Sequence, residues 1–274
     1  MEERLSLLLV VEVEDIKPLD INIANRILEL SRLAHQREIV AFSDFLNLDQ
    51  LHTLHNLPKV DLSTQYITFG GYIGAERQMV AFYQDALSFN GEVNLIDALH
   101  FPMAVIFIKP TNIKYSDDLT HRDYLGAILN LGIERSKVGD ILVNLNSSYV
   151  FLHASLTDYI TKNLTQVRRT SVIVTQISLG SFTYQPEFTE IKGSVSSLRL
   201  DGMLSLALSH SRNKLTGLIQ GGKVFVNGRL ILSNSYKIKD NDIISVRGVG
   251  KFKFVRVTGK TKKDRDYVLI YKYL

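Results

Sequence analysis

The 274-residue chain contains no cysteine, which removes several kinds of chemistry at once. Disulfide bonds, thiolate nucleophiles and cysteine-based zinc sites are all excluded. A long hydrophobic run is also missing, because the apolar stretch Leu5–Val11 ends at Glu12. A membrane span needs about 20 apolar residues, and a signal peptide needs a positively charged start and a longer apolar core. We therefore expect Leu5–Val11 to be a buried strand and the protein to be soluble and cytoplasmic, with no membrane partner.

Motifs of nucleotide and metal chemistry are incomplete. The stretch VTGKT has Phe254 where a phosphate-binding loop requires its first glycine. The stretch HRDYLGAILN shares part of its spelling with a kinase catalytic loop, but the chain has no Asp-Phe-Gly motif. His52 and His55 have no third ligand nearby in the sequence. We expect no metal site, no cofactor and no small-molecule substrate.

Charge is distributed unevenly along the chain. Residues 190–274 hold 17 Lys and Arg against 6 Asp and Glu, a net charge of +11, whereas residues 1–189 carry a net charge of −7. Such asymmetry predicts a C-terminal module that contacts a polyanion. The alternative is a solvated basic tail, but the apolar periodicity of this segment argues against it, since a tail has no core.

The hydrophobic pattern predicts an α+β protein whose first part is mainly helical. Ile23, Ile27, Leu30 and Ala34 recur at helical spacing. A second helix is expected to begin at a Ser43 cap and to end before a proline. The predicted organisation is a mainly helical domain at 1–80, a middle domain at 81–180, a linker at 181–197 and a C-terminal domain at 198–274.

The middle domain shows the order β-α-β-β-α-β, which is typical of the ferredoxin-like or RRM-like fold. Tyr149 and Phe151 lie on one face of a central strand, where an RRM places aromatic rings that stack on bases. The glycine-flanked aromatic signature of an RRM is missing, so we interpret both rings as core. Arg168 and Arg169 form a basic spot that we consider as a secondary RNA contact.

The C-terminal domain begins with two helical patterns, RLDGMLSLALSHS and RNKLTGLIQGG, which are followed by hairpins. Asn227-Gly228 is a strong signal for a tight hairpin turn. Arg212 is expected in the first turn of its helix, where a cation is unfavourable to the helix dipole and a phosphate is favoured. This placement predicts an external anion, whereas a solvated side chain is the alternative for each residue alone.

The segment from Arg199 to Gly248 resembles the small RNA-binding module named after small-subunit ribosomal protein S-four. The resemblance is carried by Arg199-Leu200-Asp201, Ser211-Arg212, Ile219, Gly222, Val224, Val226-Asn227-Gly228 and Asp242. It implies that structured RNA lies across the second helix and its hairpin. Asp201 is expected to orient an arginine. The RNA-binding residues predicted from the resemblance and the charge pattern are Arg199, Ser211, Arg212, Lys214, Lys223, Asn227, Arg229, Lys251 and Lys253.

Three further stretches resemble the YlmH family of bacterial RNA-binding proteins: FGGYIGAERQ, LTHRDYLGAILNLGIERSKVGDILV and GSVSSLRLD. This resemblance implies binding to rRNA of the large ribosomal subunit, with peptidyl-tRNA as a further partner, in the rescue and quality control of stalled translation. It also implies an association with cell division. The first 20 or so residues do not match the pattern of the family.

Two other functions are compatible with such a module. One is a non-specific RNA-binding adaptor linked to cell division. The other is an rRNA pseudouridine synthase, because those enzymes can carry the same module and use an Arg-Leu-Asp loop. Here Asp201 is followed by GMLSLALS and lies inside the module, so we expect no catalytic residue and no enzyme activity.

Overall fold

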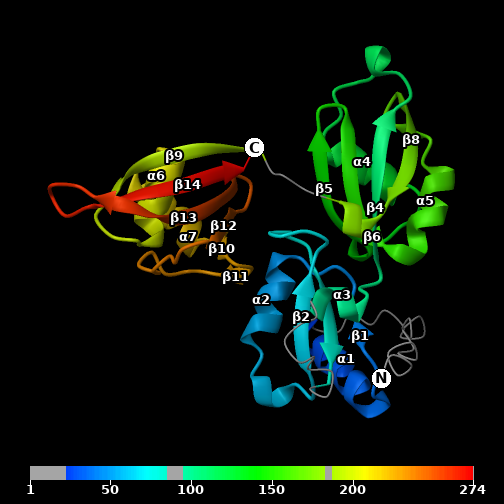
Figure 1. Cartoon of the computed structure of the whole chain (residues 1–274), viewed down its shortest axis with the longest axis horizontal. Helices are drawn as coiled ribbons and strands as arrows, with labels where there is room; N and C mark the ends of the chain where they lie inside the picture. The colour runs from blue at the N-terminus through cyan, green and yellow to red at the C-terminus, as the bar shows by residue number, and fades with distance from the viewer. Residues whose placement is uncertain (1–22, 85–94, 183–186, 274) are drawn as a thin grey trace. The chain divides into compact units, whose positions relative to one another are not determined.

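A computed structural model of the protein describes residues 23–84, 95–182 and 187–273 (Figure 1). The chain divides into two compact units, Met1–Thr183 and Tyr184–Leu274. Both units combine helices with antiparallel sheets, so the predicted α+β class is confirmed. The strand predicted at Leu5–Val11 lies outside the described residues.

The first part of unit 1 is a three-stranded sheet packed against two helices. These elements are α1 (Ile23–Arg37), β1 (Ala41–Phe42), α2 (Leu48–Asn56), β2 (Gln65–Phe69) and β3 (Met79–Tyr83), with the strands in the order β1-β3-β2. The apolar helix face predicted at Ile27, Leu30 and Ala34 is confirmed, because all three side chains are buried. The two helices fit the predicted mainly helical domain at 1–80, but that prediction did not include the sheet, whose strand β3 crosses the boundary at residue 80.

The strand β3 was not predicted from the sequence, because both of its faces are buried. Val80 and Phe82 pack with α1 and α2, whereas Met79 and Ala81 pack with the sheet of the middle domain. A strand that is buried on both faces lacks the alternation of polar and apolar residues by which a strand is recognised.

The predicted Ser43 cap is also wrong. The helix α2 begins at Leu48, and its N-cap residue is Asn47. The Asn47 side chain accepts a hydrogen bond from the Gln50 N–H at 3.0 Å. The Gln50 side-chain oxygen accepts a hydrogen bond from the Asn47 N–H at 2.8 Å, which completes a capping box. Ser43 instead accepts a bond from the Val80 N–H at 2.9 Å and so connects the chain to β3.

The middle domain contains the predicted β-α-β-β-α-β order, with a helix before it and one additional short strand before the last. Its elements are α3 (Leu95–Leu99), β4 (Met103–Pro110), α4 (His121–Leu129), β5 (Val138–Asn144), β6 (Ser147–His153), α5 (Thr157–Asn163), β7 (Gln166–Val167) and β8 (Thr170–Ile177). The strands form one antiparallel sheet in the order β5-β6-β4-β8-β7. One face packs against α4 and α5, and the other face contributes Val105 and Phe151 to a cluster shared with β3.

Asp140 on β5 joins the two parts of unit 1. Its carboxylate accepts hydrogen bonds from the Tyr72 hydroxyl at 2.7 Å, the Glu76 N–H at 2.7 Å and the Arg77 N–H at 3.0 Å. These three donors lie in the loop between β2 and β3, which is the FGGYIGAERQ stretch. The stretch is therefore a structural joint between the first sheet and the middle domain.

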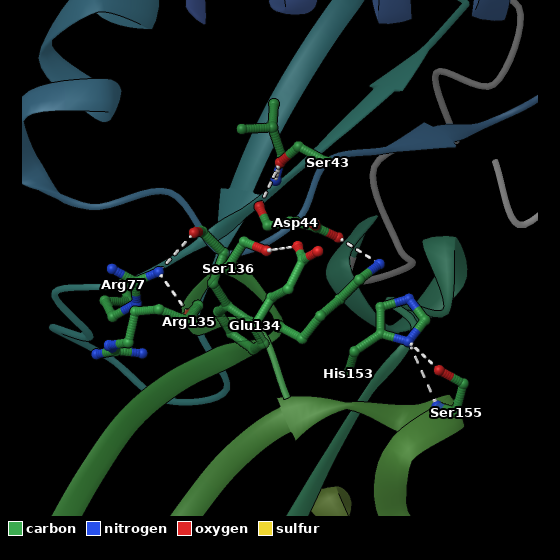
Figure 2. Close-up of polar contacts among 11 residues, drawn as sticks. Ser43, Asp44, Arg77, Glu134, Arg135, Ser136, His153 and Ser155 are labelled. Carbon is green, nitrogen blue, oxygen red and sulfur yellow. Dashed lines mark hydrogen bonds and ion pairs between the residues drawn. The ribbon is translucent and has the colours of Figure 1, made fainter. Parts of the chain in front are cut away.

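The Arg77 side chain also connects the β2–β3 loop to the middle domain (Figure 2). Its guanidinium donates to the carbonyl oxygens of Phe45 at 2.8 Å and Arg135 at 3.2 Å. It also donates to the carbonyl oxygen of Val138 at 2.9 Å. Burial and the nearby charge of Arg135 lower the pKa of Arg77 to about 10, although Asp140 acts in the opposite direction. Arg77 therefore stays charged at neutral pH, and its contacts are charge-assisted hydrogen bonds.

Unit 2 is a six-stranded antiparallel sheet in the order β11-β10-β12-β13-β14-β9. Its elements are β9 (Phe188–Val195), α6 (Leu200–Leu208), α7 (Arg212–Gln220), β10 (Val224–Val226), β11 (Arg229–Leu230), β12 (Ile243–Val246), β13 (Gly250–Lys260) and β14 (Asp266–Tyr273). Apolar side chains of α6 and α7 form one core with one face of this sheet. The two predicted helices and both predicted hairpins of this domain are confirmed.

The strand β9 replaces most of the predicted linker at 181–197. It pairs with β14 from Phe188 to Val195. The strand lies at the edge of the sheet, and Val195 is its one fully buried residue. A strand with so little burial has a weak apolar pattern, which is why its composition resembled a linker.

Gly71→Ala is expected to destabilise unit 1 strongly. Gly71 has φ +94°, and a Cβ at this position would overlap with the Phe151 ring. The left-handed backbone and the steric overlap together predict a loss of about 2–4 kcal/mol in the free energy of unfolding. Urea denaturation followed by circular dichroism measures this loss.

Gly132→Ala is the matched control. Gly132 also has positive φ, +82°, but a Cβ there would meet nothing within 4 Å. The backbone effect alone predicts a loss of about 1–2 kcal/mol. Equal losses for the two variants would contradict the close packing of Gly71 on Phe151.

Candidate nucleic-acid interface

Arg199 is held in place by Asp201 at the start of α6. Its Nε and Nη2 atoms donate to the two carboxylate oxygens at 3.1 and 2.9 Å, and the Gly202 N–H donates to the same carboxylate at 2.8 Å. These bonds and the charge of Asp201 raise the pKa of Arg199 above its usual value. The Asp201 side chain is 10% exposed and that of Arg199 is 44% exposed. The structure thus presents an oriented cation to the solvent, while its carboxylate partner lies beneath it.

The N-terminus of α7 carries three more of the predicted residues. Arg212 is the first residue of the helix, and the exposed Ser211 is its N-cap residue. Within the described part of the chain, the Ser211 side chain makes no capping hydrogen bond. Lys214 follows two residues after Arg212 and is exposed, with Nζ 3.3 Å from His210 Nε2.

Lys223 and Arg229 extend this basic surface into the hairpin. Both side chains are exposed, Lys223 just before β10 and Arg229 at the start of β11. The Lys223 carbonyl accepts a hydrogen bond from the Arg247 N–H at 2.9 Å, which connects the hairpin to the end of β12. Arg247, which is not among the predicted RNA-binding residues, has its guanidinium 5.4 Å from the centroid of the Phe225 ring.

Asn227 occupies a structural position in the hairpin. It has φ +49° and Gly228 has φ +77°, as a tight turn of the predicted type requires. Its side-chain amide donates to Asp242 Oδ1 at 2.8 Å and its carbonyl oxygen accepts from the Ile243 N–H at 2.9 Å. The Asp242 carboxylate, which is buried, also accepts the Lys239 N–H at 2.8 Å. The amide that was predicted to contact RNA is therefore engaged within the fold.

Lys251 and Lys253 lie on the other face of the sheet from the helices. They alternate along β13 with Phe252 and Phe254, which are fully buried in the core beneath α6 and α7. Successive side chains of a strand point to opposite faces. The structure therefore separates these two lysines from Arg199 and the α7 residues, with which they were predicted to form one RNA-binding set.

The middle domain buries its central aromatic residues, as predicted. Phe151 is fully buried, and its ring lies 5.3 Å from the Tyr72 ring of the joint. Tyr149 is half-buried between Phe107 and Phe182, at centroid distances of 4.8 and 5.1 Å. The sheet face that would stack bases in an RRM is occupied here by the protein itself.

Arg168 and Arg169 are exposed in the turn between β7 and β8. Arg168 Nε lies 3.7 Å from Asp123 Oδ1, and Arg169 Nη2 lies 3.6 Å from Asp117 Oδ1. Ion pairs this long and this exposed contribute little to stability. The two residues stay a predicted secondary contact.

In the part of the chain that the structure describes, no helix has the length and apolar composition to span a membrane. The same residues include no group of three or more His, Asp or Glu side chains placed to bind a metal ion.

Comparisons with known proteins identify two RNA-related domains. Residues 100–181 match the model of the RNA-binding domain in YlmH, and residues 198–244 match the S4 domain. The ribosome-associated protein quality control protein P2 of Bacillus subtilis is 28% identical over 244 residues, which cover 87% of this chain and 89% of that protein. The solved structure of cell division protein ylmH from Streptococcus pneumoniae has a TM-score of 0.46 and 20% identity, and the match covers 60% of this chain and 96% of that chain. The predicted resemblance to the YlmH family and the predicted S4-type domain are confirmed.

Asn227→Ala is expected to destabilise the second unit. The variant removes two hydrogen bonds and leaves the buried Asp242 with one donor fewer, at a cost of about 1–3 kcal/mol in the free energy of unfolding. Thermal unfolding measures the effect. Arg229→Ala, two residues away and exposed, is the control and should change stability by less than about 0.5 kcal/mol. Equal stability of the two variants would contradict the structural role of the Asn227 amide.

Proposed function

We propose that this protein binds rRNA of the large ribosomal subunit, together with tRNA, and acts in the rescue and quality control of stalled translation. The observation that carries the proposal is the exposed Arg199, oriented by Asp201, on an S4 domain whose helix α7 begins with basic residues. The name of the Bacillus subtilis relative, a ribosome-associated quality control protein, supports the same conclusion. Work at the ribosome would place the protein in the cytoplasm.

The geometry suits recognition of RNA by shape. The deep major groove of A-form RNA is closed to side chains, so a protein reads its backbone and its unstacked nucleotides. An arginine that is already oriented loses little conformational freedom when it binds a phosphate, and its second donor edge matches the phosphate oxygens. The exposed Lys214 and Lys223 would add contacts with phosphates.

The burial of Phe151 supports assigning RNA recognition mainly to the second unit. A middle domain that used its sheet to stack bases would have to separate from the first sheet and break the hydrogen bonds of Asp140 and Arg77. Contacts of the middle domain with RNA are left to exposed residues such as Arg168 and Arg169.

We also propose that the protein is not an enzyme. A catalytic aspartate of a pseudouridine synthase would have to reach a base, but Asp201 is almost covered and has both oxygens bonded to Arg199. This arrangement supports a positioning role for Asp201. Release of isotope from labelled uridine in rRNA would contradict it.

Arg199→Ala and Arg212→Ala are each expected to weaken binding to the large subunit by about 5- to 150-fold, because each removes a charge-assisted hydrogen bond to phosphate. Asp201→Asn should weaken binding less, since the guanidinium stays but loses one of its two orienting contacts. Sedimentation of the purified protein with separated subunits measures all three effects.

Arg32→Ala, an exposed residue of α1, is the control and should bind like the unaltered protein. Loss of melting temperature with unchanged subunit binding in Arg199→Ala would contradict the RNA-contact role. Equal binding of the unaltered protein to large subunits, small subunits and unrelated RNA would favour the non-specific adaptor.

A salt titration separates these functions further. Purely electrostatic binding loses about 0.7–0.9 log units of affinity per phosphate contact for each log unit of salt. We expect the affinity for large subunits to stay above that for unrelated RNA as salt increases, because shape recognition adds contacts that salt does not screen. Equal affinities for large subunits and unrelated RNA, with identical salt slopes, would contradict ribosome specificity.

A further inference from the structure

The sheet of the second unit has a face that the helices do not cover. Side chains that face α6 and α7 include Phe252, Phe254, Val268 and Ile270, all of them buried. The residues between them on β13 and β14 therefore point to the opposite side. On that side β13 carries Lys251 and Lys253, and β14 carries Tyr267, Leu269, Tyr271 and Tyr273. The register of β13 shifts between Phe254 and Arg256, so Arg256 pairs with Leu269 and lies on this side as well. We call this side the open face.

Aromatic rings on the open face are partly exposed, with Tyr271 and Tyr273 half-buried, and two of them stack on each other. Phe188 of the edge strand β9 stacks on Tyr271 with a centroid distance of 3.9 Å and an angle of 16° between the rings. Phe188 is 41% exposed and Tyr267 is 47% exposed. The Lys251 ammonium lies 5.5 Å from the centroid of the Tyr273 ring. A group of aromatic rings that is exposed on one face of a sheet indicates a binding surface.

Basic side chains of β13 and β9 lie opposite the residues of β14 on the open face. Lys253 pairs with Tyr271, and Arg256 pairs with Leu269. Lys192 of β9 lies opposite Leu269 on the other side and has an ion pair with Glu190 at 2.6 Å. Glu190 is the one carboxylate among these facing residues, so the face as a whole is basic.

We propose that the open face binds single-stranded RNA, with bases stacked on the Phe188–Tyr271 pair and phosphates bound by Lys251, Lys253 and Arg256. Every base has a flat π-face, so rings on a sheet bind single strands without regard to sequence, and lysines between the rings track the backbone. An acidic protein partner would need the cations but would leave the stacked, partly exposed rings without a role. The inference rests on the proposed RNA binding of the second unit and adds a second contact on the side opposite Arg199.

The test measures binding of the full-length protein to a fluorescein-labelled oligouridylate of about ten nucleotides, within the usual range of such sites. Tyr271→Ala should weaken binding at least about tenfold, as the loss of one stacked base predicts. Tyr271→Phe keeps the ring and should bind within about twofold of the unaltered protein. Tyr159→Ala, which removes an exposed tyrosine of α5, should have no effect. An oligomer of abasic ribose phosphate should bind weakly and equally to all four proteins.

Comparison with Arg199→Ala distinguishes this inference from the proposed function. Arg199→Ala should lose large-subunit binding and keep its affinity for the oligouridylate. If Tyr271→Ala keeps that affinity, or if the unaltered protein binds large subunits but not the oligouridylate, the inference is overturned while the proposed function stands. Reduced stability of Tyr271→Ala with unchanged affinity would assign the Phe188–Tyr271 stack to the attachment of β9 alone.

Discussion

The arrangement of the first unit depends on the hydrogen bonds of the Asp140 carboxylate. A carboxylate that leaves water needs donors to replace the water, and here the donors come from Tyr72, Glu76 and Arg77. Because all three lie in the β2–β3 loop, the bonds form when the first sheet packs against the sheet of the middle domain. That packing covers Phe151, so the face on which an RRM binds RNA stabilises the fold of this protein instead.

The second unit uses buried carboxylates in the same way but with a different result. Asp242 accepts bonds from Asn227 and Lys239 and so attaches the hairpin to β12. Asp201 holds Arg199, whose guanidinium stays exposed. Each buried carboxylate thus positions a segment that carries basic residues. The chain from residue 190 onwards has a net charge of +11, which favours an anionic partner.

Local signals in the sequence identified the second unit well. The pair Asn227-Gly228 has few alternatives to a tight turn, because both residues adopt positive φ at little cost. Apolar positions three and four residues apart predicted α1, α6 and α7, since a helix is built from contacts near in sequence. The excess of lysine and arginine after residue 189 predicted an anionic partner, because charge at the surface does not depend on how strands pair.

The sequence by itself thus determined the helices α1, α6 and α7, the tight hairpins, the order of the main elements in the middle domain and the basic character of the second unit. Tertiary structure alone decided that β3 is buried on both faces, that β9 is an edge strand and that Lys253 lies on the opposite face from Arg199. It also decided that the Asn227 amide serves the fold. The physical reason is that each of these depends on pairing between segments far apart in the chain, which local propensity does not encode.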